Sequence, residues 1–416
     1  MNVIPICAEA HDAKIVDLWS DVHEKTKELT GVEMEHLRIV ETVIKKDGTY
    51  IVLACDGWNE GDAAYIYHID YEGNLLNVLK LKRELPLVGG IGIDDEENMY
   101  VAYGTELEEG QDDETVLRLV KYDEYGEKLA VYDVKGRNGD STLDTIKIAF
   151  SFGSCDININ NGIVTCLFAR EMFQSDDGLN HQASFSFAVN AENLETVSNN
   201  ITYCSHSFEQ TIYYDGSDFI FMDTGDAYPR GFLLSKVDGK TAEEQKVCVP
   251  MKFKLGPGGL EHDTDRIDYN YTFSELGGIT KLKNQYLFFG TYENKTENPN
   301  LYSSRNLFTQ MISLDLEDFE SPCYQTDYVD IDEGNQSMSE MLGVHNPAGF
   351  EIGKYYGILY DVKKDNDITR EMIFLDENGD NVGRTKIHKN RQSELANDVF
   401  YYIKIQTIFN YLFITS

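Results

Sequence analysis

The sequence has few of the features that divide a chain into domains. Only 8 prolines and 2 tryptophans occur in its 416 residues, and no Pro- or Ser-rich linker interrupts it. Linkers of that composition commonly separate independently folded parts. Their absence favours one large domain over residues 1–416, which is longer than an ordinary domain but within the range of repeat folds.

Cysteine is also scarce and lacks a functional pattern. The seven cysteines form no CxxC pair and show no spacing typical of a zinc site. An odd number excludes a fully paired disulfide framework, although one bridge between neighbouring strands is compatible with the sequence. Most of them lie in apolar, strand-like segments, where we expect a buried thiol to act as a small hydrophobic group.

Long apolar segments are missing. The first thirty residues carry charges throughout, and no run of 18 apolar residues occurs. The sequence therefore predicts no membrane insertion and shows no leader, so a secreted origin would require that a leader had been removed. The compartment stays undetermined at this stage.

Basic residues are outnumbered two to one. The chain has 36 Lys and Arg against 72 Asp and Glu, a formal net charge of −36. Such a surface repels nucleic acid and anionic membranes, which excludes both as partners. The charge is explained by solubility, or alternatively by attraction of cations or basic partners.

What the sequence does have is a short pattern that returns six times. An alternating apolar run ends in an acidic or amide residue and is followed by a turn. The residues that end these runs are Asp70, Asp123, Asn190, Asp238, Asp315 and Asp376. Their spacings of 53, 67, 48, 77 and 61 residues suit a four-stranded unit with variable loops.

Each repeat has an earlier apolar run and, before that, a segment of small residues. Examples of the small-residue segments are LVGGIGIDDEEN and SELGGITKLKN. Glycine in a strand indicates close approach of another backbone, so we expect these strands to be innermost. With 26 Tyr and 21 Phe, the aromatic content also favours β-structure. The predicted fold class is all-β.

These repeats resemble the β-propeller superfamily. The resemblance implies four-stranded blades over about 37–85, 86–140, 141–200, 201–255, 270–330 and 338–390. Residues 398–416 look like half a blade, which residues 2–19 could complete, giving seven blades closed by both termini. Six blades with a decorating N-terminal segment are the alternative. The segments SHSFEQ at 205–210 and GDAYPRG at 225–231 resemble uncharacterised bacterial propeller proteins and imply no particular activity.

The main candidate site lies around the third and fourth repeats. In a propeller the connection into the first strand of a blade and the connection from its second to its third strand emerge on one face. The polar residues that this rule brings together are His181, Gln182, His206, Gln210, Asp226, Tyr228 and Arg230. A group of this kind implies a network or a ligand, because polar side chains at a strand start are costly to bury unless they are paired.

Structural roles compete with the functional one. Arg230 recurs in position as Arg305 and Arg370, so it could pair with an acid of a neighbouring blade, and His206 could bond a loop carbonyl. On the same predicted face, Trp58 could stack on a sugar or pack between blades. His345 at the start of the sixth repeat would also point there.

No cofactor is expected. Calcium is conceivable at the acidic turn 376–381, but the EF-hand spacing is absent and a solvated turn explains those residues.

Two functions follow as hypotheses. The first is a non-catalytic, monomeric recognition protein that binds a glycan or a protein partner on its loop-rich face. The alternative is a carbohydrate-active enzyme such as a polysaccharide lyase, with Arg230 and His181 neutralising a uronate, His206 as base and Tyr228 as acid. The net charge of −36 opposes a polyanionic substrate, so the sequence favours recognition and leaves catalysis open.

Overall fold

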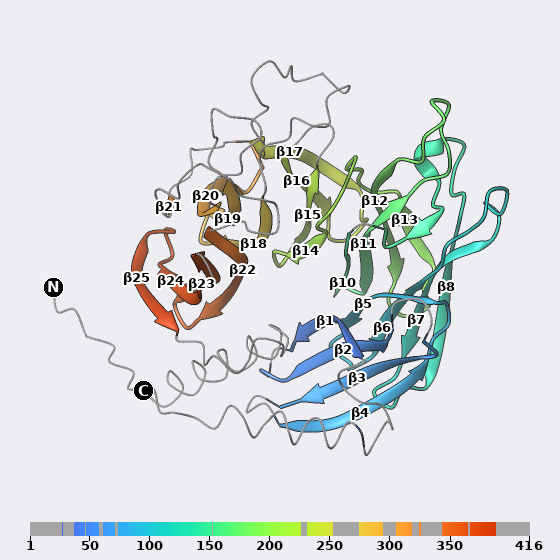
Figure 1. Cartoon of the computed structure of the whole chain (residues 1–416), viewed down its shortest axis with the longest axis horizontal. Coiled ribbons are helices and arrows are strands. Elements are labelled where there is room, and N and C mark those ends of the chain that lie inside the picture. The colour runs from blue at the N-terminus through green and yellow to red at the C-terminus, as the bar shows by residue number, and fades with distance from the viewer. Residues whose placement is uncertain are drawn as a thin grey trace. The chain divides into compact units, whose positions relative to one another are not determined.

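The computed structural model describes Lys27 and residues 37–45, 47–57, 61–70, 74–151, 153–225, 231–252, 274–293, 305–317, 324–325, 343–364 and 367–387. The chain divides into two compact units. The first contains residues 1–83 and 397–412, and the second contains residues 84–396 and 413–416. Nearly all the secondary structure within the described residues is β-strand, which confirms the all-β prediction (Figure 1).

In the first unit the described strands form one antiparallel sheet in the order β1-β2-β3-β4. The strands are β1 (Leu37–Ile44), β2 (Tyr50–Asp56), β3 (Ala63–Ile69) and β4 (Leu75–Lys82). β2 and β3 are buried almost throughout, whereas β4 is exposed at half of its positions. The two middle strands therefore supply most of the core of this unit.

The second unit contains sheets of four main antiparallel strands. The first is β5 (Leu87–Ile93), β6 (Met99–Gly104), β7 (Thr115–Tyr122) and β8 (Lys128–Lys135). The next is β10 (Cys155–Asn160), β11 (Ile163–Glu171), β12 (Gln182–Asn190) and β13 (Thr196–Asn199), with the short β9 (Ile148–Ala149) beside β11. A 3-10 turn, η2 (Thr142–Asp144), precedes β9.

Three further runs follow in the same order along the chain. One is β14 (Thr211–Tyr214), β15 (Asp218–Gly225), β16 (Gly231–Asp238) and β17 (Glu244–Lys252). Another is β18 (Glu275–Leu282), β19 (Gln285–Glu293), β20 (Arg305–Ser313) and β21 (Tyr324–Gln325). The last is β22 (Gly343–Ile352), β23 (Tyr355–Lys364), β24 (Asp367–Leu375) and β25 (Asn381–Ile387). A single parallel pairing of Arg305 with Gly343 joins these last two runs into one sheet.

The first main strand of each sheet contacts the first strand of the next. Within the second unit β5 contacts β10, β10 contacts β14, β14 contacts β18 and β18 contacts β22. Hydrophobic clusters fill the space between consecutive sheets, for example Phe168 and Phe187 against Tyr100 and Leu119. Sheets of four strands that pack face to face in sequence order fit the blades expected from the repeats.

Glycine permits one of these close approaches. A Cβ at Gly92 in β5 would lie 2.3 Å from Cδ1 of Ile159 in β10, well inside van der Waals contact. The small-residue segment at 87–93 is therefore explained by crowding between two inner strands.

The recurring acids at strand ends close turns. Oδ1 of Asp123 accepts hydrogen bonds from the backbone N–H groups of Tyr125 and Glu127, at 3.0 and 2.8 Å. Oδ1 accepts a backbone N–H in the same way at Asp70, Asn190, Asp238 and Asp376. In the fifth repeat the turn is closed by Ser313, whose Oγ accepts from Glu317 N at 3.0 Å, two residues before the expected Asp315. The repeat thus reflects a local side chain–backbone bond that several polar residues can make.

All cysteines within the described residues are buried thiols and not disulfides: Cys55, Cys155, Cys166, Cys204 and Cys248. The Sγ atoms of Cys155 and Cys166, on neighbouring strands, are 3.7 Å apart. No helix in the described part of the chain is long and apolar enough to cross a membrane. The segments 2–19 and 398–416, proposed to form a composite blade, lie outside the described residues.

Candidate functional site

The segment from Cys204 to Gln210 lies between two sheets. Ser205 forms a bridge with Ala183 at the start of β12, and Ser207 forms one with Gly225 at the end of β15. This segment therefore brings the start of β12, the end of β15 and the approach to β14 to one edge of the second unit. These are the connections that the sequence analysis expected to meet.

Two of the predicted histidines lie side by side at this edge. The ring centroids of His181 and His206 are 6.4 Å apart. Nε2 of His181 is 2.7 Å from Oδ2 of Asp177, and hydrogen bonds from Ser175, Leu179 and His181 lower the pKa of the Asp177 carboxyl to about 2. His181 is thus oriented by an exposed carboxylate of its own loop.

His206 is placed by its backbone. Its N–H donates to the carbonyl oxygen of Gln182 at 2.8 Å, and its φ of 51° lies in the left-handed region, which is unusual for a residue with a Cβ. The Gln182 side chain donates through Nε2 to the carbonyl oxygen of Ser207. The predicted pair Gln182 and His206 therefore joins β12 to the 204–210 segment.

Gln210 is buried and belongs to a network centred on Asp223. Its Nε2 donates to Ser207 Oγ and, at 3.2 Å, to Asp223 Oδ1, while its Oε1 accepts from Ser154 N at 2.7 Å. Ser207 Oγ also lies within 2.9 Å of both oxygens of Asp223. Burial raises the pKa of the Asp223 carboxyl to about 8, against the effect of these hydrogen bonds. The amide of Gln210 is thus engaged with protein groups on both of its atoms.

A second acid, Glu209, connects this edge to the next sheet. Its Oε2 accepts from Thr224 Oγ1 at 2.9 Å and from the backbone N–H of Leu276 at 2.6 Å. Burial raises the pKa of Glu209 to about 7. Glu209 was not among the residues predicted from sequence, although it lies inside the SHSFEQ segment.

His345 meets a carboxylate and a guanidinium at the start of β22. Its Nδ1 is 3.1 Å from Oε1 of Glu275, which also pairs with Arg305, and Oε2 of Glu275 accepts from Asn346 N at 2.6 Å. Although burial opposes ionisation, the hydrogen bond with His345 and the charge of Arg305 lower the pKa of Glu275. Arg305 pairs here with an acid of its own sheet, since β18 and β20 flank β19.

The same edge ends in a buried ion pair. Arg370 donates to both oxygens of Asp361, and Nδ2 of Asn346 is 3.4 Å from Asp361 Oδ2. Polar contacts therefore continue from Glu275 through His345 and Asn346 to Asp361. The acidic and basic side chains at this edge are thus paired with one another.

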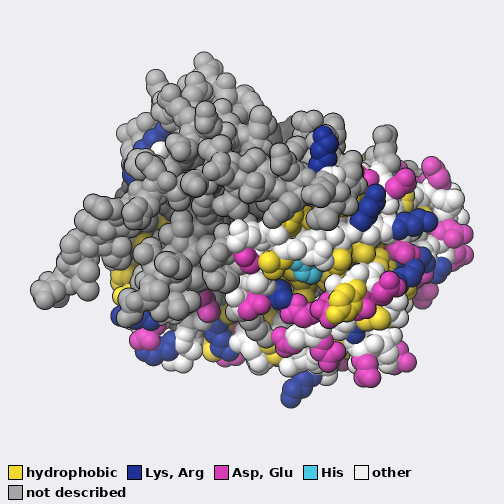
Figure 2. Space-filling view, turned by 90° about the horizontal axis from the view of Figure 1, so that it is seen from below, with side chains coloured by type: hydrophobic (Ala, Val, Ile, Leu, Met, Phe, Trp, Pro, Cys, Tyr) yellow, Lys and Arg dark blue, Asp and Glu magenta, His cyan; other side chains and the backbone are white. Residues whose placement is uncertain are grey.

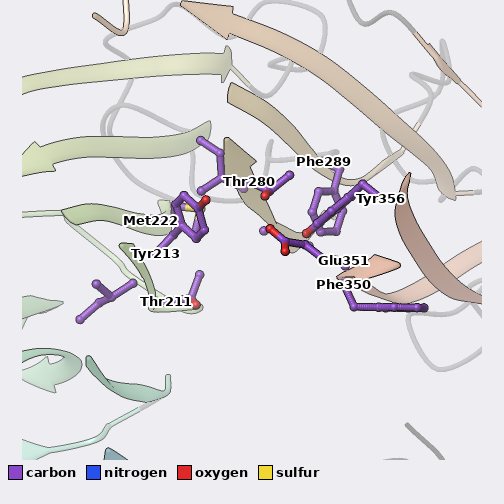
Figure 3. A pocket seen from close by; sticks show the side chains of 13 residues that line it. Thr211, Tyr213, Met222, Thr280, Phe289, Phe350, Glu351 and Tyr356 are labelled. Carbon is purple, nitrogen blue, oxygen red and sulfur yellow. The ribbon is translucent and has the colours of Figure 1, made fainter. Parts of the chain in front are cut away.

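A cavity of about 310 Å³ opens beside these strands. It is lined by residues of β14, β18 and β22 together with Met222, Phe289 and Tyr356. In Figure 3, Tyr213 and Met222 lie on one side, Phe289, Glu351 and Tyr356 lie on the other, and Thr280 lies between them. Its size is in the range of small-molecule sites, and its lining combines rings, hydroxyl groups and a carboxylate.

Trp58, Asp226, Tyr228 and Arg230 lie outside the described residues. At the acidic turn considered for calcium, Oδ1 of Asp376 accepts from Asn378 N and Asp380 N at 2.9 and 3.0 Å. These bonds close the turn in the same way as those at Asp123.

The surface of the described part carries many acids. On the face shown in Figure 2, Asp and Glu side chains are spread among hydrophobic side chains, with Lys and Arg between them. The many acidic side chains on this face agree with the net charge of −36.

Comparisons with known proteins give only distant structural likenesses. No family model matches the chain, and no curated protein matches it. Among solved structures, the Dos1 propeller is similar at 12% identity, over 84% of this chain and 71% of that one, with a TM-score of 0.42. A quinoprotein alcohol dehydrogenase-like protein from Bacteroides thetaiotaomicron is similar at 10% identity, over 84% and 66%, with a TM-score of 0.41.

A family 43 endo-arabinanase from Bacillus licheniformis is also similar, at 13% identity, over 70% of this chain and 95% of that one, with a TM-score of 0.32. These proteins include different activities, and their identities and TM-scores are low. The function of this chain therefore has to be argued from its own residues.

Proposed function

We propose that this chain is a β-propeller that recognises a glycan or a protein without chemically changing it. The six four-stranded runs would be blades, and the terminal segments 2–19 and 398–416 would complete a seventh. The consecutive contacts β5–β10–β14–β18–β22 support this arrangement, because inner strands are neighbours around a propeller axis.

The observation that carries the recognition function is the cavity between β14, β18 and β22. Three four-stranded runs, which belong to two sheets, contribute residues to it, so the binding surface depends on the assembled fold and not on one loop. Aromatic rings, hydroxyl groups and one carboxylate supply apolar contact together with a few directional polar groups, as binding sites do.

The paired polar residues at the edge of the second unit support the same proposal. Glu275, Arg305 and His345 are paired with one another, and Gln210 and Asp223 share the buried network of Ser207. A general acid or base must be within reach of a substrate proton, whereas these groups are within reach of each other. They are better suited to holding the sheets in place around the cavity.

The proposal can be tested on glycan and peptide arrays with labelled protein. The variant Glu351→Trp places a large ring at the cavity from an exposed position, and Glu192→Trp places one in the exposed turn between β12 and β13. We expect array ligands to bind the wild type and Glu192→Trp and to be lost by Glu351→Trp.

Recovered ligands should have unchanged mass. A new product, such as a 4,5-unsaturated sugar that absorbs in the near ultraviolet, would show catalysis and overturn the proposal. Binding that Glu351→Trp leaves intact would move the recognition surface away from the cavity.

A further inference from the structure

The described residues that line the cavity carry charge of only one sign. Of the described residues that line it, only Glu351 is formally charged at neutral pH, and no Lys or Arg lines it. Glu351 is exposed at the end of β22, so its carboxylate can be reached from solvent. Among the described residues, a ligand group that enters would meet one negative charge and no positive charge.

Aromatic rings surround this carboxylate. Figure 3 shows Glu351 and Tyr356 side by side, with Phe289 beside Tyr356 and Tyr213 opposite them. The ring centroids of Phe289 and Tyr356 are 6.0 Å apart, with a T-shaped arrangement. Rings near a carboxylate suit an organic cation, because the ring faces and the carboxylate both attract positive charge.

Glycine leaves room for the aromatic side chains of the lining. A Cβ at Gly349 would lie 2.1 Å from the hydroxyl oxygen of Tyr356 and 2.6 Å from Cζ of Phe289. Gly278 lines the cavity with a φ of 141°, a conformation that side chains disfavour. The lining is therefore fixed by residues on two neighbouring inner strands.

The field of the whole molecule acts in the same direction. A net charge of −36 raises the local concentration of cations and speeds their approach. The acidic surface and the carboxylate of the cavity are two separate observations that favour the same sign of ligand.

We propose that the cavity between β14, β18 and β22 binds an organic cation, either an alkylammonium or a guanidinium, with Glu351 as its counter-ion and Tyr213, Phe289 and Tyr356 as its walls. The chemistry is that of a lysine or arginine side chain, and a free amine would share it. This inference rests on the proposed recognition function and adds the class of ligand.

Calorimetric titration tests it with four capped amino acids and one free amine. The probes are the N-acetyl methylamides of lysine, arginine, norleucine and glutamate, together with butylamine. Norleucine has the alkyl chain of lysine without the ammonium group, so it isolates the contribution of charge.

We expect the lysine and arginine probes to bind and the norleucine and glutamate probes to bind at least about tenfold more weakly, as the loss of a charge-assisted bond implies. Glu351→Gln should weaken the lysine probe by a similar factor. Glu192→Gln makes the same change in net charge away from the cavity and should leave binding unchanged. If butylamine binds as tightly as the lysine probe, the ligand is a free amine. If the lysine probe binds more tightly than butylamine, the ligand is a peptide side chain.

Equal binding of lysine and norleucine, or full binding by Glu351→Gln, would overturn the cation assignment. If array ligands still bind and are lost by Glu351→Trp, the recognition function survives that result with an uncharged ligand. If no array ligand binds and no cation binds, both proposals fail together.

Discussion

The guanidinium of Arg370 donates to both carboxylate oxygens of Asp361, at 2.7 and 2.8 Å, and both side chains are buried. Arg118 makes the same bidentate pair with Asp133, also at 2.7 and 2.8 Å, but those side chains are 29% and 33% exposed. The second unit thus contains two ion pairs of equal geometry that differ in burial.

We predict that removing one partner has very different effects at the two pairs. Arg370→Met should lower the free energy of unfolding by about 3–5 kcal/mol, because it leaves the Asp361 carboxylate buried without its guanidinium. Arg118→Met should cost about 1 kcal/mol or less, because water can replace the lost partner. Urea unfolding of both variants measures the difference, and equal losses would contradict the role assigned to burial.

Asp223 should make stability fall as pH rises. Burial raises the pKa of its carboxyl from 3.8 to about 8, so the folded state keeps a proton that the unfolded chain releases above about pH 4. Each increase in pH between about 4 and 8 therefore favours the unfolded state. Asp223→Asn cannot titrate, and its urea midpoint should fall less between pH 5 and pH 8 than that of the wild type.

Glu209 contributes to the same slope. Its pKa is raised to about 7, so the Asp223→Asn variant should keep part of the pH dependence and the added Glu209→Gln change should remove more of it. Identical slopes in the wild type and the double variant would show that neither carboxyl holds its proton in the folded state.

Gly349→Ala should destabilise the second unit. The added Cβ would lie 2.1 Å from the Tyr356 hydroxyl oxygen, and overpacking of this kind costs about 1–3 kcal/mol. Tyr356→Phe removes that oxygen, so the double variant should recover part of the loss. A double variant as unstable as the sum of the two single variants would contradict the contact.

In the first unit, Arg83→Lys should be costly although the charge is kept. Arg83 is buried, and its Nη2 donates to Asp56 Oδ1 at 3.0 Å and to the carbonyl oxygens of Asp56 and Gly57 at 2.8 Å each, while its Nε donates to Ala63 O at 3.1 Å. Lysine has no planar fork and cannot make these bonds together.

We expect Arg83→Lys to lower the free energy of unfolding by about 2–3 kcal/mol, in line with lost bonds to buried and part-buried acceptors. Arg38→Lys, an exposed position in β1 of the same sheet, is the control and should change it by less than about 0.5 kcal/mol. Thermal unfolding followed by circular dichroism compares the two.

Much of the strand and turn pattern could be predicted from sequence because it depends on local chemistry. Alternating residues predict strands, and an acid after a strand predicts a turn, as at Asp123. The fifth repeat was misaligned by two residues because a serine hydroxyl can make the same bond, so Ser313 closes the turn expected at Asp315. Blade number and closure stay predictions.

The site was harder to predict from the sequence because its contacts join residues far apart in the chain. The meeting of His181 with His206 follows from strand order, but the bond from Leu276 to Glu209 spans two sheets and leaves no local signal. Glycine was interpreted as crowding, which holds at Gly92 and also at Gly349, where a Cβ would lie 2.1 Å from the Tyr356 hydroxyl oxygen. The sequence does not identify the crowding side chain, which lies on the next sheet at Gly92 and on the next strand at Gly349.

Each four-stranded run of the second unit contacts its neighbours in the sequence through its first main strand, from β5 through β10, β14 and β18 to β22. Structural order can therefore spread from one sheet to the next during folding, without waiting for distant parts of the chain to meet. Local opening would follow the same route. Amide hydrogens of β11 and β15, in sheets with a neighbour on either side, should then be among the last to exchange with solvent.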